Sequence, residues 1–315
     1  MKKNSFTFEV VLAFSFLIVS CFLALRFGSV FDADSSIIYQ LRLPRVLLAV
    51  AVGMGLSVAG ACLQALFSNP LCEPYTLGIS SGAALGAVIG TTLGGFWIVS
   101  GLTISAFIGA LAFTLVLYFV SIRPGNSTLT LLLSGVMMGF FGSGLVALWM
   151  SLADSNGIQA AVFWLLGDLS RARMGGAWVT LFSSCILSGA LWLRSRQFDA
   201  LLMGEEDAIS LGVDVSVLRR RVIIVVSLLV SLCVSASGMI GFLGLLVPHL
   251  VRRRVGALHG KMLPLCAVWG ATLLVIADML ARVSVRPFEL PVGVVTALVG
   301  APVFMWILLK RGSQV

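Results

Sequence analysis

The sequence predicts an all-α polytopic membrane protein, and three observations support this fold class. Hydrophobic residues make up 59% of the 315-residue chain, charged residues only 11%, and the mean hydropathy is +1.08. A soluble domain carries about 25% charged residues. Uncharged runs long enough to cross a bilayer, about 20 residues, recur along the chain, and no polar stretch between them is long enough to bury its own core. We therefore expect residues 1–315 to form a single transmembrane domain.

The first apolar segment covers about residues 7–27. Its start, MKKNSFTFEVVLAFSFLIVSC, also resembles a signal peptide, and IVSC resembles a lipoprotein cleavage site. The apolar run continues past Cys21 to Leu25 and many more runs follow, so we interpret it as an uncleaved first membrane helix. The second span covers about 46–67.

Two long uncharged stretches are each divided into two spans, and the first of them, 74–122, is too long for one helix. Residues 74–122 are divided by GTTLGG at 90–95 into the third and fourth spans, and residues 222–251 are divided by SASGMIGFLG into the seventh and eighth. The fifth, sixth, ninth and tenth spans lie at about 128–152, 175–193, 263–281 and 291–309. The sequence thus predicts ten transmembrane helices, or nine if a single helix runs through 222–251.

The distribution of positive charge favours ten spans. With the N-terminus inside and ten crossings, 14 of the 21 Lys and Arg residues lie on the inner side and seven on the outer side. Because cytoplasmic loops are enriched in Lys and Arg, we expect both termini in the cytoplasm. Nine spans would place Lys310 and Arg311 outside.

The net charge of +8 does not indicate nucleic-acid binding, because no basic patch is interleaved with aromatic residues. We assign the charge instead to contacts with anionic membrane lipid. The six cysteines form no CxxC pair and lie mostly in apolar runs, so neither a disulfide framework nor a metal site is predicted. The chain contains no GxxxxGKS-type phosphate loop.

The connector FSNPLCEPYTLGISSGAALG, residues 67–86, is unusually polar and rigid for its place between two apolar spans. Each proline removes a backbone donor and disfavours helix in the residue before it, so Pro70 ends the second span and Pro74 stiffens the turn. The connector is either an ordinary tight turn or a constriction at the inner mouth of a pathway, with Asn69 and Leu71 pointing into it.

The longest polar stretch is DALLMGEEDAISLGVDVSVLRRR, residues 199–221. EEDAISLG predicts a short helix with acidic residues at its start and glycine at its end. The stretch is either a solvated loop or a docking element for a soluble partner. Its clustered carboxylates do not indicate acid–base catalysis, because no nucleophile, metal site or phosphate loop accompanies them.

Two titratable residues lie inside or near the spans. Asp278 is an intramembrane acid, a position that is often functional, but it precedes Arg282 by one helical turn. The sequence therefore leaves open an internal ion pair and an ion-coupling site. His249, near the inner end of the eighth span, either packs against its neighbours or relays protons.

The outer side carries arginines and one short apolar segment. Arg42 and Arg45 in LRLPR precede the second span. They either reach back to the lipid interface or belong to a positive rim that receives an acidic partner. IQAAVFWLLG, residues 158–167, predicts a short helix lying across the outer mouth as a lid.

Several of these stretches together resemble a known family, the membrane-spanning permeases of bacterial ABC importers for iron–siderophores, haem and cobalamin. They occur in the family's order from about residue 40 to the C-terminus: LRLPR, NPLCEPYTLGISSGA, GEEDAISLGV, GFLGLLVPHLVR and ELPVGVVTALVGAPVFMWILLKR. The first 40 residues match only as a first helix.

The resemblance implies the fold of a type II ABC importer permease, with ten helices per subunit, in the bacterial inner membrane. It implies four kinds of partner: a second permease copy in a homodimer, two ATPase subunits on the cytoplasmic side, a periplasmic substrate-binding protein outside, and membrane lipid. ATP and Mg²⁺ would bind the ATPases. No cofactor, metal site or catalytic residue is therefore expected on this chain, which would not itself be an enzyme.

The resemblance also implies roles for individual residues. Asn69 and Leu71 of the NPL turn would line a cytoplasmic gate, as would Ser127 and Thr128, where the match is looser. Three arginines would meet acidic residues on the two lobes of the binding protein: Arg42, Arg45 and Arg282. The loop at about 199–214 would dock on the ATPase through Gly204, Glu205, Glu206, Asp207, Ser210 and Gly212.

The main alternative is a secondary transporter driven by an ion gradient through Asp278. Such a transporter normally needs several intramembrane ionisable groups, and this chain has essentially one. An intramembrane enzyme would need a catalytic constellation that the two histidines do not supply, and a structural subunit would need no ATPase. We expect an iron–siderophore as cargo because it is the broadest class in the family, with cobalamin or haem next.

Overall fold

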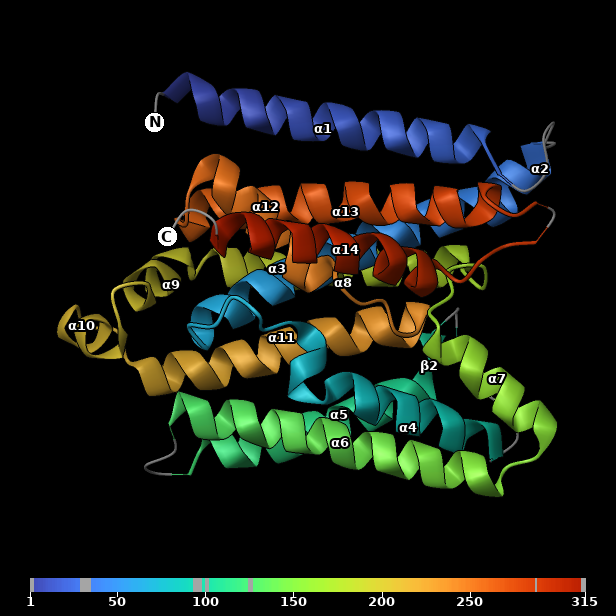
Figure 1. Ribbon diagram of the computed structural model, residues 1–315, viewed down its shortest axis with the longest axis horizontal. Helices are drawn as coiled ribbons and strands as arrows, with labels where there is room; N and C mark the ends of the chain where they lie inside the picture. The colour runs from blue at the N-terminus through green and yellow to red at the C-terminus, as the bar shows by residue number, and fades with distance from the viewer. Residues whose placement is uncertain are drawn as a thin grey trace.

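The computed structural model describes residues 3–28, 35–92, 98–99, 102–123, 127–286 and 288–312. The helices run roughly side by side along the long axis of the molecule (Figure 1), which confirms the helical fold class. Ten of them correspond to the ten expected spans: α1 (Lys3–Arg26), α3 (Leu43–Leu66), α4 (Ile79–Thr92), α5 (Ile104–Ser121), α6 (Thr128–Leu152), α8 (Met174–Trp192), α11 (Val215–Ser237), α12 (Leu243–Val255), α13 (His259–Val283) and α14 (Val292–Gly312).

Length and composition support a multi-pass membrane protein. Six stretches of helix in the described residues are long and apolar enough to cross a membrane: Phe6–Arg26, Ser35–Leu66, Ile104–Ser121, Thr128–Leu152, Met174–Trp192 and His259–Val283. Two shorter apolar helices lie at Ile79–Gly90 and Val292–Ile307. Helix α11 begins with a basic turn, and α12 has only 13 residues. The count of ten crossings therefore stays a prediction.

Helices α11 and α12 are separate, so the alternative of one helix through 222–251 is wrong. Gly238 and Phe242, which bound the break, have φ angles of 67° and 70°, a left-handed backbone that cannot continue a right-handed helix. Helix α11 also starts earlier than expected, because the carboxylate of Asp214 accepts a hydrogen bond of 3.0 Å from the Val217 N–H and caps the helix.

Short elements join the long helices. They are α2 (Ser35–Ile37), a π-helical turn η1 (Ile38–Arg42), a 3₁₀ turn η2 (Pro74–Leu77), α7 (Ser155–Leu165), α9 (Ser195–Leu201), α10 (Glu205–Ser210) and the strands β1 (Ile98–Val99) and β2 (Leu102–Thr103). The structure contains the short helix expected at 158–167 as α7. The antiparallel pair β1–β2 follows GTTLGG and was not predicted.

Glycines allow the central helix α3 to contact its neighbours backbone to backbone. A Cβ atom on Gly53 would lie 2.3 Å from the Gly270 carbonyl oxygen of α13, and one on Gly60 would lie 2.0 Å from the Gly244 carbonyl oxygen of α12. Both distances are far below van der Waals contact. Close approach of this kind replaces the hydrophobic drive between helices in lipid, so the α3–α13 and α3–α12 contacts require glycine.

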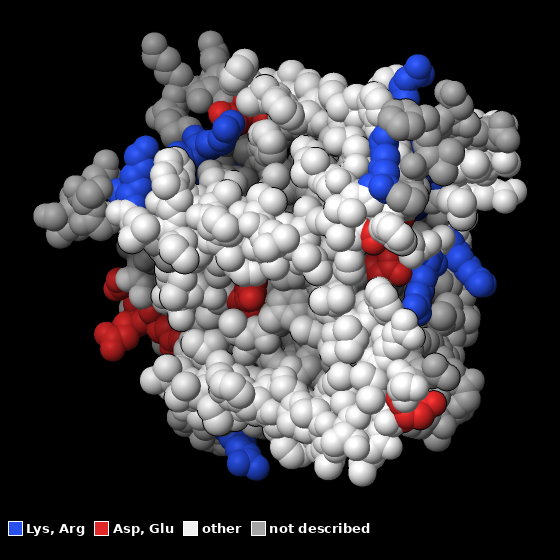
Figure 2. Space-filling model, turned by 45° about the vertical axis from the view of Figure 1, so that its right-hand side comes forward, with Lys and Arg blue, Asp and Glu red and all other residues white. Residues whose placement is uncertain are grey.

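The two ends of the bundle differ in what they carry. Figure 1 shows α9 and α10 at one end, together with the start of α1 and the end of α14, and α2 and α7 at the opposite end. We call these the α10 end and the α7 end. Figure 2 shows a broad, nearly uncharged band of surface between charged groups near the ends, as expected of a surface that faces lipid.

Candidate functional site

The connector after α3 is held by its own backbone and by one asparagine. The Asn69 N–H donates to the Gln64 carbonyl oxygen at 3.1 Å, and the Asn69 side-chain oxygen accepts from the Leu71 N–H at 3.0 Å. This Asx turn leaves the Leu71 side chain 52% exposed. The structure thus gives Asn69 a turn-forming role and presents Leu71 outward, and the gate role of both residues stays a prediction.

Beyond Cys72 the connector is wedged between two parts of the bundle. A Cβ atom on Gly244 of α12 would lie 2.5 Å from the ring of Pro74. On the other side, Gly78 has φ 70°, and a Cβ there would lie 2.7 Å from the Gly139 nitrogen of α6. Only glycine fits these contacts without displacement. The connector therefore links α12 to α6 rigidly.

Helix α10 is a short surface helix with unusual exposed side chains. It begins after Gly204, whose φ is 116°, and is followed by Gly212, whose φ is 83°. Glu205, Glu206 and Asp207 occupy its first turn, where they favourably meet the helix dipole, and the Ser210 hydroxyl donates to the Glu206 carbonyl oxygen. Four apolar side chains on and beside α10 are about half or more exposed: Leu202, Met203, Ile209 and Leu211.

Asp214, the last residue of the loop at about 199–214, is ionised. Hydrogen bonds from the Val217 N–H and the Ser216 hydroxyl hold the pKa of the Asp214 carboxyl below its usual range. The carboxylate therefore stays charged at neutral pH and keeps its cap on α11. This fixes where the loop at about 199–214 ends and helix α11 begins.

A hydrogen-bonded network joins α10 to α6 and α11. Thr128, the first residue of α6, donates through its hydroxyl to Glu205 Oε1, and Arg219 Nη2 of α11 donates to Thr128 Oγ1. Arg219 Nη2 also lies 3.0 Å from Glu205 Oε1. The Arg219 side chain is only 10% exposed. We call these three residues the Thr128–Glu205–Arg219 network. Ser127 caps α6 beside it by accepting from the Thr130 N–H.

The three arginines expected to meet a binding protein are turned inward. Arg42 donates from Nη1 to the carbonyl oxygens of Leu25 and Arg26, both at 2.8 Å, and so caps the end of α1. Arg45 and Arg282 both bind Asp278, at 2.7 Å and 3.1 Å. The side chains of the three arginines are nearly covered. Their docking role stays a prediction.

Asp278 therefore belongs to a buried ion cluster at the α7 end. Arg45 reaches a second carboxylate, Glu289, at 2.6 Å. Of the two readings left open by the sequence, the structure shows the internal ion pair of Asp278 with Arg282, extended by Arg45. Glu289 was missed, although it stands in the ELPVG stretch directly before the last helix. A carboxylate within that stretch could have indicated a partner for Arg45 and its neighbouring arginines.

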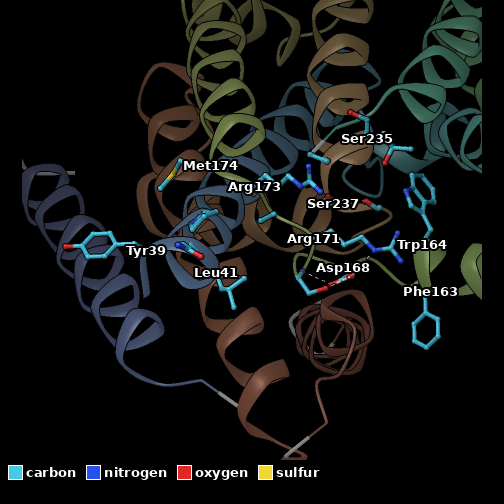
Figure 3. A pocket seen from close by; sticks show the side chains of 17 residues that line it. Tyr39, Leu41, Phe163, Trp164, Asp168, Arg171, Arg173, Met174, Ser235 and Ser237 are labelled. Atoms are coloured by element: carbon cyan, nitrogen blue, oxygen red, sulfur yellow. Dashed lines mark hydrogen bonds and ion pairs between the residues drawn. The ribbon is translucent and has the colours of Figure 1, made fainter. Parts of the chain in front are cut away.

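A cavity of about 610 Å³ lies at the α7 end. Figure 3 shows Tyr39 and Met174 on one side of it and Trp164, Asp168 and Arg171 on another. Asp168 accepts hydrogen bonds from the N–H and hydroxyl of Ser170 and lies 3.7 Å from Arg171. Arg171 and Arg173 are both exposed. No periodic pattern in the sequence predicted this cavity, because its lining comes from four separate segments.

The remaining candidate groups are structural in this arrangement. His249 packs edge-on against Phe304 with ring centroids 5.8 Å apart, and His259 contacts Asp199 through Nδ1 at 2.8 Å. Within the described part of the chain, no group of three or more His, Cys, Asp or Glu side chains could hold a metal ion.

Comparisons with known proteins agree over nearly the whole chain. The model of the FecCD transport family matches residues 5–310. The hemin transport system permease protein HmuU of Yersinia pestis is 40% identical over 292 residues, 90% of this chain and 86% of that protein. The vitamin B12 import system permease protein BtuC of Vibrio vulnificus is 38% identical over 306 residues, 96% of this chain and 91% of that protein.

The fold agrees as well. A solved structure described as an inward-facing, metal-chelate type ABC transporter aligns with a TM-score of 0.86 and 30% identity, covering 95% of this chain and 97% of the other. The family match, the two relatives and the shared fold lead to one conclusion: the chain belongs to the FecCD transport family.

Proposed function

We propose that this chain is the membrane-spanning permease subunit of an ABC importer for a metal chelate, working as a homodimer in the bacterial inner membrane. Two ATPase subunits would bind ATP and Mg²⁺ and dock at the α10 end, and a periplasmic binding protein would deliver cargo at the α7 end. In this orientation both termini are cytoplasmic and ten helices cross the bilayer. The relatives' names, which refer to hemin and vitamin B12, support the cargo class.

The Thr128–Glu205–Arg219 network carries the proposal. It joins a loop that exposes apolar side chains, as partner surfaces do, to the first residue of α6. Helix α6 in turn contacts the connector at Gly78. A displacement of α10 by an ATPase would therefore reach both segments that are expected to form the inner gate. The chain contributes motion, and the covalent chemistry takes place on the ATPase.

The cargo is a bulky metal chelate. An iron–siderophore, expected from the breadth of the family, stays a prediction. Haem and cobalamin, the next candidates from the sequence, are supported more directly, because the named relatives are hemin and vitamin B12 permeases. All three belong in the transport test described below.

We propose that exposed arginines at the α7 end make the direct charge contacts with the binding protein. Arg42, Arg45 and Arg282 are bound by their own chain, so we propose that they shape the outer surface. Arg171 and Arg173, which are exposed beside the cavity, are placed to meet acidic residues of a partner.

The ion-driven alternative receives less support from the structure. Its coupling acid, Asp278, is 1% exposed and lies against two arginines. A coupling site must release and rebind its ion, whereas the Asp278 carboxylate is occupied by two arginines of its own chain.

The proposed function is tested in proteoliposomes that contain the chain, its partner ATPase and the binding protein loaded with each chelate. Ile209→Glu/Leu211→Glu should abolish ATPase association, and the control Arg196→Glu, with the same change in net charge, should retain it. Uptake that continues without ATP hydrolysis and follows an ion gradient would refute the proposal.

A second arm tests the outer face. Arg171→Glu/Arg173→Glu should remove stimulation of ATP hydrolysis by the binding protein while basal hydrolysis persists. Stimulation that survives this double substitution would show that the partner docks elsewhere.

A further inference from the structure

A groove beside the short helix α12 is not used by any step described above. Helix α12 has 13 residues, whereas α13 behind it has 25. Two adjoining hollows lie along it. One of about 120 Å³ is lined by Val247, Leu250, Val251, Arg254, Trp269 and Leu273. The other, of about 90 Å³, lies between α12, α13 and α14 and shares Leu273 with the first.

The groove is apolar along its length and basic at one end. Its lining is apolar except at Arg254, in the last turn of α12, and Thr296 of α14, and its aromatic members are Trp269 and Phe242. The Arg254 guanidinium lies 5.5 Å from the centre of the Trp269 ring, and Arg254 Nη1 lies 3.3 Å from Glu9 Oε2 of α1. The Glu9 side chain is 16% exposed and that of Arg254 is 51% exposed. Glu9 and Trp269 thus hold Arg254 in place while half of its side chain remains accessible.

Further cations lie close to Arg254 along the chain at the α10 end. Arg252 and Arg253 precede it, and Lys261 follows at the start of α13, where its ammonium lies 5.5 Å from the Phe6 ring centre. Arg253 also donates to the Ile307 carbonyl oxygen of α14 at 3.4 Å. Glu9 is the one carboxylate found against Arg254 in the described residues. The net charge at this end of the groove is therefore strongly positive.

We propose that this groove binds an anionic phospholipid, with one acyl chain along α12 and the phosphate at Arg254. Basic pockets between transmembrane helices are suited to anionic headgroups, and tryptophan lies preferentially at the headgroup level. A free phosphate ion is not the expected main ligand, because it would leave the apolar lining uncovered. Most of the contact area of a bound lipid would instead come from its hydrocarbon chain. The lipid would come from the leaflet at the α10 end.

The size of the groove separates a lipid chain from a protein segment. A helix with its side chains is about 10–12 Å across, so hollows of about 120 and 90 Å³ would admit single side chains of a protein partner but not its backbone. A single acyl chain is slender enough to follow them. A second copy of this chain could therefore cover the groove without filling it.

The proposal is tested on the full chain purified in detergent and stripped of lipid, by native mass spectrometry with added phosphatidylglycerol, phosphatidylcholine or glycerol phosphate. Phosphatidylglycerol should bind more tightly than phosphatidylcholine. Arg254→Ala should weaken phosphatidylglycerol binding about five-fold, as expected for one cation near a charged headgroup. The matched control Arg123→Ala removes an exposed arginine away from the groove and should change nothing.

A second variant keeps the test decisive if Arg254→Ala does not fold. Leu273→Trp fills the point where the two hollows meet without changing charge, and it should weaken binding of the intact lipid. Equal affinity for the two phospholipids would overturn the proposal. So would an equal loss in Arg123→Ala, or glycerol phosphate competing as well as the intact lipid. Crosslinking that places a second copy inside the groove would do so too. None of these readouts depends on transport, so they are separate from the test of the proposed function.

Discussion

Asp278 shows how a single buried charge is accommodated at the residue scale. Its carboxylate is held between Arg45 and Arg282, and a buried pair is stable only while its partners remain. Helix α13 supplies Asp278 and Arg282, and α3 supplies Arg45. The cluster therefore joins α3 and α13 at the α7 end, and the same two helices also meet through Gly53 and Gly270.

Removing the Asp278 charge should destabilise the fold. We expect Asp278→Asn to cost about 3–5 kcal/mol, because it leaves two buried arginines facing each other, and to lower the midpoint of thermal unfolding in detergent. The control Asp168→Asn removes a partly exposed carboxylate 3.7 Å from Arg171 and should cost no more than about 1 kcal/mol. Equal midpoints for Asp278→Asn and wild type would contradict this account.

The Thr128–Glu205–Arg219 network should act as one unit. Thr128→Val and Arg219→Gln should each lower the chelate taken up per ATP hydrolysed, and the double variant should be no worse than either. The expected coupling energy is about 0.5–3 kcal/mol for residues in one network. Uptake and hydrolysis are measured together in proteoliposomes.

Another variant of helix α11 serves as the control for this comparison of single and double variants. Arg221→Gln removes an exposed arginine of α11 two residues from Arg219 and should leave the ratio of uptake to hydrolysis unchanged. Strictly additive effects of Thr128→Val and Arg219→Gln would mean that the two residues act separately.

At the element scale, the glycine contacts of α3 decide how closely helices pack. Gly60→Ala places a Cβ 2.0 Å from the Gly244 carbonyl oxygen, so we expect a loss of about 1–3 kcal/mol from overpacking. Gly189→Ala, in α8, adds the same methyl group where nothing lies within 4 Å. Thermal unfolding in detergent compares the two, and a Gly60→Ala midpoint equal to that of Gly189→Ala would rule out a tight contact.

The sequence predicted the helices better than their ends. Charge-free runs located ten helices, because lipid demands apolar length. The start of α11 was missed by seven residues, since its first turns carry Arg219 to Arg221 and resemble a loop. The β1–β2 pair was missed because two-residue strands have no period to detect.

At the scale of the whole molecule, sequence reasoning located surfaces but not contacts. The docking loop and the connector stood out because they are polar or rigid in apolar surroundings. That Thr128 bonds Glu205, 77 residues away, depends on tertiary packing and has no local signal. Likewise, arginines beside a span look the same in sequence whether they face solvent, as Arg171 does, or bind their own chain, as Arg45 does.

The proposed orientation can be tested by labelling. Arg171→Cys at the α7 end should react with a membrane-impermeant maleimide added to intact cells. Arg196→Cys at the α10 end should react only in inverted vesicles. Wild type, whose six cysteines are mostly buried, gives the background. Labelling of Arg196→Cys in intact cells would reverse the orientation.

The brevity of α12 has a consequence for how the protein is made. Helix α12 has 13 residues and carries three arginines in its last turn. Its apolar part is too short for the insertion machinery to place it in the bilayer as an independent span. It needs a packing site that is already present in the membrane. Helix α3 provides one: Gln64 of α3 donates a hydrogen bond to the carbonyl oxygen of Gly244, which is synthesised 180 residues later. Biogenesis would then be ordered: early helices act as a template, and a late segment enters the bilayer only by docking on them.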